Sequence, residues 1–144
     1  MAHRSLASRL AALAAVLLPL PATAQSIDGY YAGRLRCDAI PAKSVAALDV
    51  AFSVTLTRGN ATYRRAIHSP DGKLHITDET GEGKVAADGT VSLSGRAAFM
   101  SWHYDASYAG TVSGGSLKLL GKQHWEFGDG TTFDRPCTAI VTRG

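Results

Sequence analysis

The stretch Trp102–Phe127, WHYDASYAGTVSGGSLKLLGKQHWEF, is the part of the sequence that decides the fold. Gly114-Gly115 at its centre can adopt positive φ at two successive residues, as a two-residue primed hairpin turn requires. With these two residues as the loop, Val112 faces Leu117, and one face of both strands becomes apolar and aromatic in register. The stretch therefore predicts a long antiparallel hairpin.

The other face of this hairpin is polar. The same register places His103 opposite Glu126 and Asp105 opposite His124. Cross-strand ion pairs on the surface are the ordinary explanation of such a pattern, and weak binding of a transition metal or acid sensing is the alternative. The sequence has no HExxH motif and no paired Cys/His spacing, so we assign no metal ligand.

On both sides of the hairpin, short segments with strand alternation follow one another along the chain, and no segment predicts a strong helix. The expected strands cover residues 29–37, 50–57, 61–68, 73–78, 91–99 and 132–142. Three turns set the expected registers. A Gly59-Asn60 turn places Tyr63 opposite Leu56 and Ile67 opposite Phe52, a type I turn at 69–72 pairs Ile67 with Leu74, and a three-residue loop at 87–89 matches Val85 with Val91.

This pattern predicts an all-β protein, a small antiparallel up-and-down β-barrel of about eight strands. Cys37 and Cys137 lie near the two ends of the folded part. In an oxidising compartment such a pair is typical of a structural disulfide, which here would join the N- and C-terminal strands. A redox or metal role is the alternative, although the chain has no CxxC motif.

The first 24 residues have the features of a signal peptide. A basic start is followed by an apolar run and by Ala22-Thr23-Ala24, a small-x-small cleavage site. Cleavage leaves residues 25–144 as a single β-barrel domain and lowers the formal charge from +3 to +1, because Arg4 and Arg9 are lost. We therefore expect a periplasmic or secreted monomer without a membrane span, and no basic stripe that would bind nucleic acid.

The folded part resembles small exported bacterial β-barrel proteins of unassigned activity. The resemblance lies in Tyr31-Ala32-Gly33, in Gly121-Lys122-Gln123-His124-Trp125 and in Arg135-Pro136-Cys137. In architecture alone the chain is also similar to avidin-like and lipocalin-like barrels. The resemblance implies a barrel fold and carries over no ligand contacts.

The candidate ligand site consists of polar and aromatic side chains on the faces that we expect to point inward. In the expected register, Arg65 lies on the core side and Asp78 falls opposite Tyr63. The full set is Tyr31, Tyr63, Arg65, Asp78, Tyr104, Tyr108, Gln123, Trp125 and Arg135. A buried guanidinium needs a partner or an anionic ligand. One interpretation is a cavity in which Arg65 or Arg135 meets a ligand's acidic group, and the other is an Arg65–Asp78 salt bridge inside a packed barrel.

The sequence offers no catalytic constellation and no cofactor motif, so we expect a protein that binds rather than an enzyme. The first hypothesis is an exported binding protein for an acidic or aromatic small molecule in the barrel interior. The alternative is an envelope protein-interaction module or enzyme inhibitor, with loops 38–48 and 79–84 making the contacts.

Overall fold

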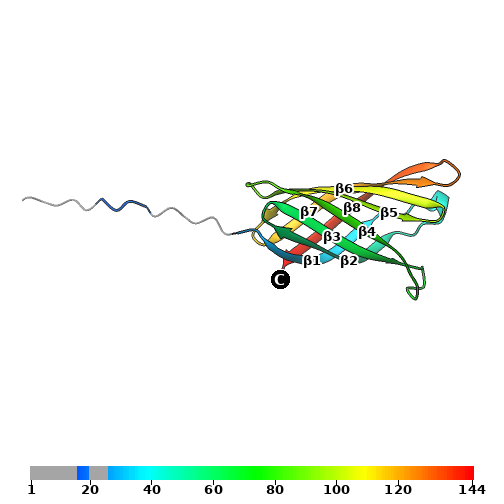
Figure 1. Ribbon diagram of the computed structural model, residues 1–144, viewed down its shortest axis with the longest axis horizontal. Helices are drawn as coiled ribbons and strands as arrows, with labels where there is room; N and C mark the ends of the chain where they lie inside the picture. The colour runs from blue at the N-terminus through cyan, green and yellow to red at the C-terminus, as the bar shows by residue number, and fades with distance from the viewer. Residues whose placement is uncertain (1–15, 20–25) are drawn as a thin grey trace, which may run out of the picture.

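The computed structural model describes residues 16–19 and 26–144, and residues 29–143 form a barrel (Figure 1). Its strands are β1 (Gly29–Cys37), β2 (Leu48–Thr57), β3 (Asn60–His68), β4 (His75–Val85), β5 (Thr90–Phe99), β6 (Trp102–Ser113), β7 (Ser116–Phe127) and β8 (Thr132–Arg143). A short 3-10 turn, η1 (Pro41–Lys43), lies in the connection from β1 to β2.

Each strand pairs antiparallel with the next one in the sequence, and β8 returns to pair with β1. The sheet is therefore a closed eight-stranded up-and-down barrel, which confirms the predicted fold class. Within the described residues, no helix is both long enough and apolar enough to cross a membrane.

The β6–β7 hairpin has the predicted register over its whole length. Trp102 pairs with Phe127 at one end and Val112 with Leu117 at the other. The loop is Gly114-Gly115, with φ of 57° and 76°, in the left-handed region that favours glycine. A two-residue turn with both φ positive matches the twist of the flanking strands, and it fixes which side chains face inward.

The barrel closes between β1 and β8, where Cys37 lies directly opposite Cys137 and forms the predicted disulfide with it. A disulfide across the closing strand pair fits an oxidising, exported location. The predicted signal peptide, residues 1–24, lies outside the described residues except for 16–19.

The two ends of the described barrel domain meet at the opposite end of the barrel from the disulfide (Figure 1). The Arg143 side chain donates a hydrogen bond to the backbone oxygen of Ser26 at 2.7 Å. The backbone N–H of Gly144 donates to the oxygen of Tyr30 at 3.1 Å. The first and last residues of the domain are therefore neighbours.

The predicted register of β2 with β3 is wrong by two residues. The turn is formed by Arg58 and Gly59, both with positive φ, and not by Gly59-Asn60. Leu56 consequently faces Ala61 rather than Tyr63. Because side chains alternate along a strand, a shift of two residues leaves the inward-facing set unchanged.

The predicted register of β3 with β4 is also wrong, and here the difference has consequences. Ile67 pairs with Thr77 instead of Leu74, and the register shifts between Ile67 and His68 as in a β-bulge. The shift of three residues is odd, so every residue of β4 lies on the face opposite to the one predicted. The predicted loop at 79–84 is wrong too, since these residues lie inside β4, whereas the Val85–Val91 pairing is confirmed.

The barrel interior is filled by side chains. Tyr31, Tyr104 and Tyr108 are among its largest fully buried residues, and leucine, valine and phenylalanine side chains pack around them. The ring of Tyr63 lies against β4 and β5 at positions without side chains. A Cβ at Gly81 or Gly95 would come within 2.1 or 1.8 Å of this ring and its hydroxyl, so both glycines are needed to admit it.

Candidate functional site

Glu79 is the centre of a buried polar cluster. Its side chain has no exposed surface, and its carboxylate accepts hydrogen bonds from an arginine and three tyrosines. The Nε and Nη2 atoms of Arg65 donate to Oε2 at 3.1 and 2.7 Å, and Tyr104 donates to the same oxygen at 2.7 Å. Tyr63 and Tyr108 donate to Oε1 at 2.9 and 3.0 Å. We call these five residues the Glu79 cluster.

The charge state of the Glu79 cluster follows from its burial. Burial, followed by the Glu79 charge, raises the pKa of Tyr63, Tyr104 and Tyr108 well above the usual tyrosine range, so all three stay neutral donors. Burial lowers the pKa of Arg65, but the Glu79 carboxylate together with Tyr104 and Tyr108 raises it by more, and the net shift is upward. The cluster is thus an ion pair whose carboxylate is further satisfied by hydroxyl groups.

A second set of polar side chains continues the network from Tyr108. Gln123 donates from Nε2 to the Tyr108 hydroxyl at 3.0 Å. Its Oε1 accepts from Arg135 Nε at 2.8 Å and from Trp125 Nε1 at 3.2 Å. The guanidinium of Arg135 also lies over the Trp125 ring, 5.0 Å from its centroid. Of the nine predicted site residues, the structure thus joins Tyr63, Arg65, Tyr104, Tyr108, Gln123, Trp125 and Arg135 into one connected network.

The buried charges of this network do not cancel. Among the described residues with less than a tenth of their surface exposed, Arg65 and Arg135 are cations and Glu79 is the one anion. Arg135 has neutral partners, namely Gln123 and the backbone oxygens of Asp38 and Ala46 at 3.3 Å. Burial lowers its pKa, and the charge of Arg65 acts in the same direction. The interior therefore carries an excess positive charge, which favours an anion nearby.

The predicted inward orientation of Asp78 is wrong. Asp78 lies on the outer face of β4, where it pairs with Arg64 at 2.6 Å and with His75 at 3.1 Å. The Arg64 guanidinium holds the pKa of this carboxyl below its usual value. The register shift at Ile67/His68 puts Glu79 in the place that we predicted for Asp78.

Tyr31 is also apart from the network, although it is fully buried as predicted. Its hydroxyl donates to the backbone oxygen of Ile27 at 2.7 Å, near the end of the barrel where the termini meet. Tyr31 therefore anchors the segment before β1.

Glu79 is not among the site residues predicted from the sequence, although the sequence contains a signal for its inward orientation. The 87–89 loop correctly pairs Val85 with Val91, and both are inward-facing positions. Alternation counted backwards from Val85 places Gly83, Gly81 and Glu79 on the same inner face. Counting forwards from the turn at 69–72 gave the opposite result because a bulge intervenes.

An open seam runs between β2 and β3. These strands are hydrogen-bonded over three residue pairs only, from Thr57↔Asn60 to Thr55↔Thr62, while β3 pairs with β4 along its full length. Beyond Thr55 and Thr62 the ladder stops, and a cleft of about 410 Å³ opens there. Residues of three strands line it: Tyr30, Ala32 and Gly33 of β1, Val50 to Ser53 of β2, and Arg64, Arg65, Ala66 and His68 of β3.

Arg65 connects this cleft with the Glu79 cluster. Its side chain is 7% exposed and lines the cleft from within. Nε and Nη2 bond Glu79 and Tyr104, whereas Nη1 has no hydrogen-bond partner among the described residues. Every fully buried side-chain nitrogen and oxygen that the structure describes has a partner, so Nη1 must reach accessible space. Arg65 thus offers two N–H donors to a molecule in the cleft.

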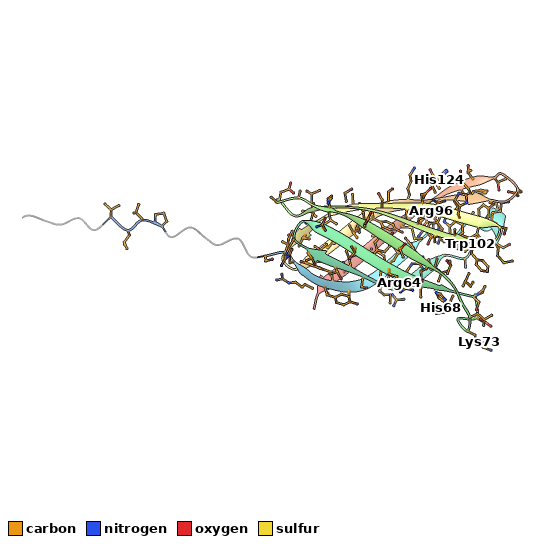
Figure 2. All side chains as sticks on the ribbon, viewed as in Figure 1. Arg64, His68, Lys73, Arg96, Trp102 and His124 are labelled. Atoms are coloured by element: carbon orange, nitrogen blue, oxygen red, sulfur yellow. A yellow bond between two sulfur atoms is a disulfide. The ribbon has the colours of Figure 1, made fainter. Side chains whose placement is uncertain are left out.

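The remaining rim of the seam is also basic. Arg64 and His68 lie on either side of Arg65 along β3, on its outer face, and Figure 2 shows both side chains on the side of the barrel that leads to the projecting 69–74 turn. The Arg64 guanidinium forms an ion pair with Asp78 of the neighbouring strand β4. An anionic group in the cleft would therefore meet Arg65, which Glu79 fixes in place, with His68 on the rim.

The outer-face histidines of the long hairpin lie opposite carboxylates as predicted. His103 pairs with Glu126. His124 faces Asp105 across the strands and bonds Asp134 of β8 at 2.5 Å. In the part of the chain that the structure describes, no three His, Cys, Asp or Glu side chains are grouped as a metal site would require.

Comparison with known proteins adds no constraint: the chain matches no protein-family model, no curated protein and no solved structure. The resemblance to small exported barrel proteins therefore stays a prediction.

Proposed function

We propose that this protein is an exported binding protein whose ligand carries an acidic group and occupies the cleft between β2 and β3. The observation that carries the proposal is the position of Arg65, whose largely buried side chain lines the cleft and whose Nη1 has no hydrogen-bond partner among the described residues. A carboxylate there would accept charge-assisted hydrogen bonds from Arg65, which lines the cleft. Relative to the first hypothesis, the site moves from the barrel centre, which side chains fill, to its side.

Glu79 makes Arg65 suitable for this role. A mobile surface arginine loses side-chain entropy when it binds a ligand. Arg65 is already ordered by Glu79 and Tyr104, so binding orders its side chain little further. Nε and Nη2 both donate to Oε2 of Glu79, which leaves the Nη1 side of the guanidinium for a ligand. A charge-assisted hydrogen bond in such a partly buried place is stronger than one in bulk water.

The test is to express the full chain with export, purify it natively and identify bound molecules by native mass spectrometry. Thermal shifts with a panel of mono- and dicarboxylates follow for the wild type and Arg65→Lys. This substitution keeps the charge opposite Glu79 but removes the planar fork. Arg96→Lys, on the outer face of β5, is the matched control (Figure 2).

We expect an acidic molecule, co-purified or from the panel, to bind the wild type and the Arg96→Lys control equally. Arg65→Lys should weaken binding by about tenfold, since it removes a charged hydrogen bond. Equal binding by Arg65→Lys, in a variant that keeps the wild-type tryptophan fluorescence, would contradict the proposal.

A further inference from the structure

The backbone along the seam shows what kind of acidic ligand fits. In an antiparallel sheet the N–H and C=O groups of alternate residues point to the same neighbouring strand. Thr55 and Thr62 face each other in the last β2–β3 pairs, so the residues at even spacing from them also direct their backbone groups into the seam. These residues are Ala51 and Ser53 on β2 and Arg64, Ala66 and His68 on β3.

The β2–β3 register ends at Thr55↔Thr62, so none of these five residues is paired across the seam in the part of the chain that the structure describes. All five line the cleft. The seam is therefore bordered by two strand edges with unsatisfied donors and acceptors, which is a template for an additional strand.

The side chains along both edges leave the backbone accessible. Three of the five are small, namely Ala51, Ser53 and Ala66. Arg64 is drawn towards β4 by Asp78 and does not cover the edge. Proline and β-bulges are two of the features with which proteins block strand addition at an edge. Neither edge carries a proline inside the seam, and apart from the shift at Ile67/His68 the β3–β4 register is regular.

We infer, resting on the proposed function, that the ligand is an extended polypeptide segment that adds as a strand in the seam and places an aspartate or glutamate against Arg65. The choice of a peptide over a small acid follows from the rows of backbone groups, because a small acid would satisfy Arg65 and leave the strand edges unpaired. Charge complementarity with Arg65 selects an acidic residue.

The positions beside the acidic residue are also constrained. In an added strand, the residues two before and two after the acidic one would face the barrel on the same side. There they would meet Val50 and Phe52 of β2 and Ile67 of β3, which are buried or half-buried apolar side chains. The expected recognition pattern is therefore apolar-x-acidic-x-apolar in an extended segment.

The test is selection of short random peptides displayed on phage against the exported full-length protein, followed by calorimetry with the synthetic peptides that are enriched. Each peptide is also made with its acidic residue replaced by the amide, and with N-methyl groups on alternate backbone nitrogens. Phenylbutyrate serves as an acid without a peptide backbone.

Two proline variants separate backbone pairing from charge. Ala66→Pro removes an N–H that points into the seam but leaves the β3–β4 ladder intact, because the hydrogen bonds to β4 come from the odd-numbered residues of β3. Ala87→Pro is the matched control, since Ala87 is the second residue of the turn closed by the Gly89 N–H and the Ala86 oxygen, where proline is favoured.

We expect enriched peptides with the apolar-x-acidic-x-apolar pattern. Ala66→Pro, the amide peptide and each of the two N-methyl patterns should weaken binding by about tenfold, and Ala87→Pro should leave it unchanged. Strand addition would be refuted, and the proposed function kept, by two results together. Phenylbutyrate would bind the wild type but not Arg65→Lys, and N-methylation would not weaken binding of the peptides. Failure of every acid and every peptide would overturn both. A dimer that Ala66→Pro prevents would show instead that the seam pairs with a second copy of the chain.

Discussion

Replacement of Glu79 by glutamine tests the account of the barrel interior most directly. The carboxylate accepts five hydrogen bonds, two from Arg65 and one from each of three tyrosines. A glutamine keeps the shape of the side chain, but it removes the charge and turns an NH₂ group towards hydroxyl and guanidinium donors. Arg65 is then a buried cation without a counter-ion.

The expected loss is large for a domain of this size. Breaking a buried ion pair on one side costs about 3–5 kcal/mol, because the remaining charge is left desolvated. This is a substantial part of the roughly 5–15 kcal/mol that stabilises a small domain. It corresponds to a fall in Tm on the order of 10–20 °C. Asp78→Asn is the matched control on the adjacent residue, where an exposed pair with Arg64 is lost and little stability should change.

The assay is urea unfolding of the oxidised protein, followed by the fluorescence of the two tryptophans. The double variant Arg65→Met/Glu79→Gln removes both charges of the pair. Since this double variant has no isolated buried charge at the pair, it should be more stable than Glu79→Gln alone. Equal losses for Asp78→Asn and Glu79→Gln, or a double variant less stable than Glu79→Gln, would refute the view of Glu79 as the counter-ion of Arg65.

Other features of the barrel give three further expected outcomes. Reduction of the Cys37–Cys137 disulfide should lower the free energy of unfolding by about 4–5 kcal/mol, because the bridge closes a loop of 100 residues; equal urea midpoints with and without reductant would contradict this. The free energy of unfolding should be independent of these tyrosines below about pH 10 and should fall above it. The reason is that the three tyrosines bonded to Glu79 ionise in the unfolded chain but stay neutral in the folded one. Each tyrosine lowers the free energy of unfolding by about 1.4 kcal/mol per pH unit above that point. Tyrosinate absorbance and tryptophan fluorescence should then change together, and tyrosinate formation by these residues in the folded protein would count against the cluster. Gly83→Ala should lower the free energy of unfolding in urea by about 1–3 kcal/mol, because its Cβ would lie 1.7 Å from a carbonyl oxygen of β5. Gly144→Ala, which has open space around it, should leave the free energy of unfolding unchanged. Equal stabilities of the two variants would show that the β5 backbone shifts at little cost.

The sequence predicted those parts of the barrel in which local turn chemistry and side-chain alternation agree. In the β6–β7 hairpin, the Gly114-Gly115 turn and the apolar face specify the same register, and the structure has it. The cysteines likewise indicated which strands close the barrel, because the two thiols must lie opposite each other. Seven of the predicted site residues are connected in the interior for the same reason of alternation.

The rest depends on features that a single strand pattern does not contain. A bulge at Ile67/His68 changes the face of β4 without altering its composition, so Asp78 and Glu79 exchange their expected roles. The seam between β2 and β3 arises because the two strands diverge where the barrel closes. The sequence pattern of both strands predicts pairing along their full length. The positive φ at Arg58 is a further departure, since an arginine in that region gives no turn signal.

The two ends of the domain meet beside Arg143, so the same barrel could form from a chain that begins at a different strand. Joining residue 144 to residue 26 by a short linker and opening the chain between Gly114 and Gly115 would give a circular permutant with every strand pair retained. In that chain the disulfide would close a loop of roughly twenty residues, and its contribution would fall to about 3 kcal/mol. The same covalent bond in the same place would stabilise the same barrel less, because its contribution depends on the path of the chain between the two cysteines.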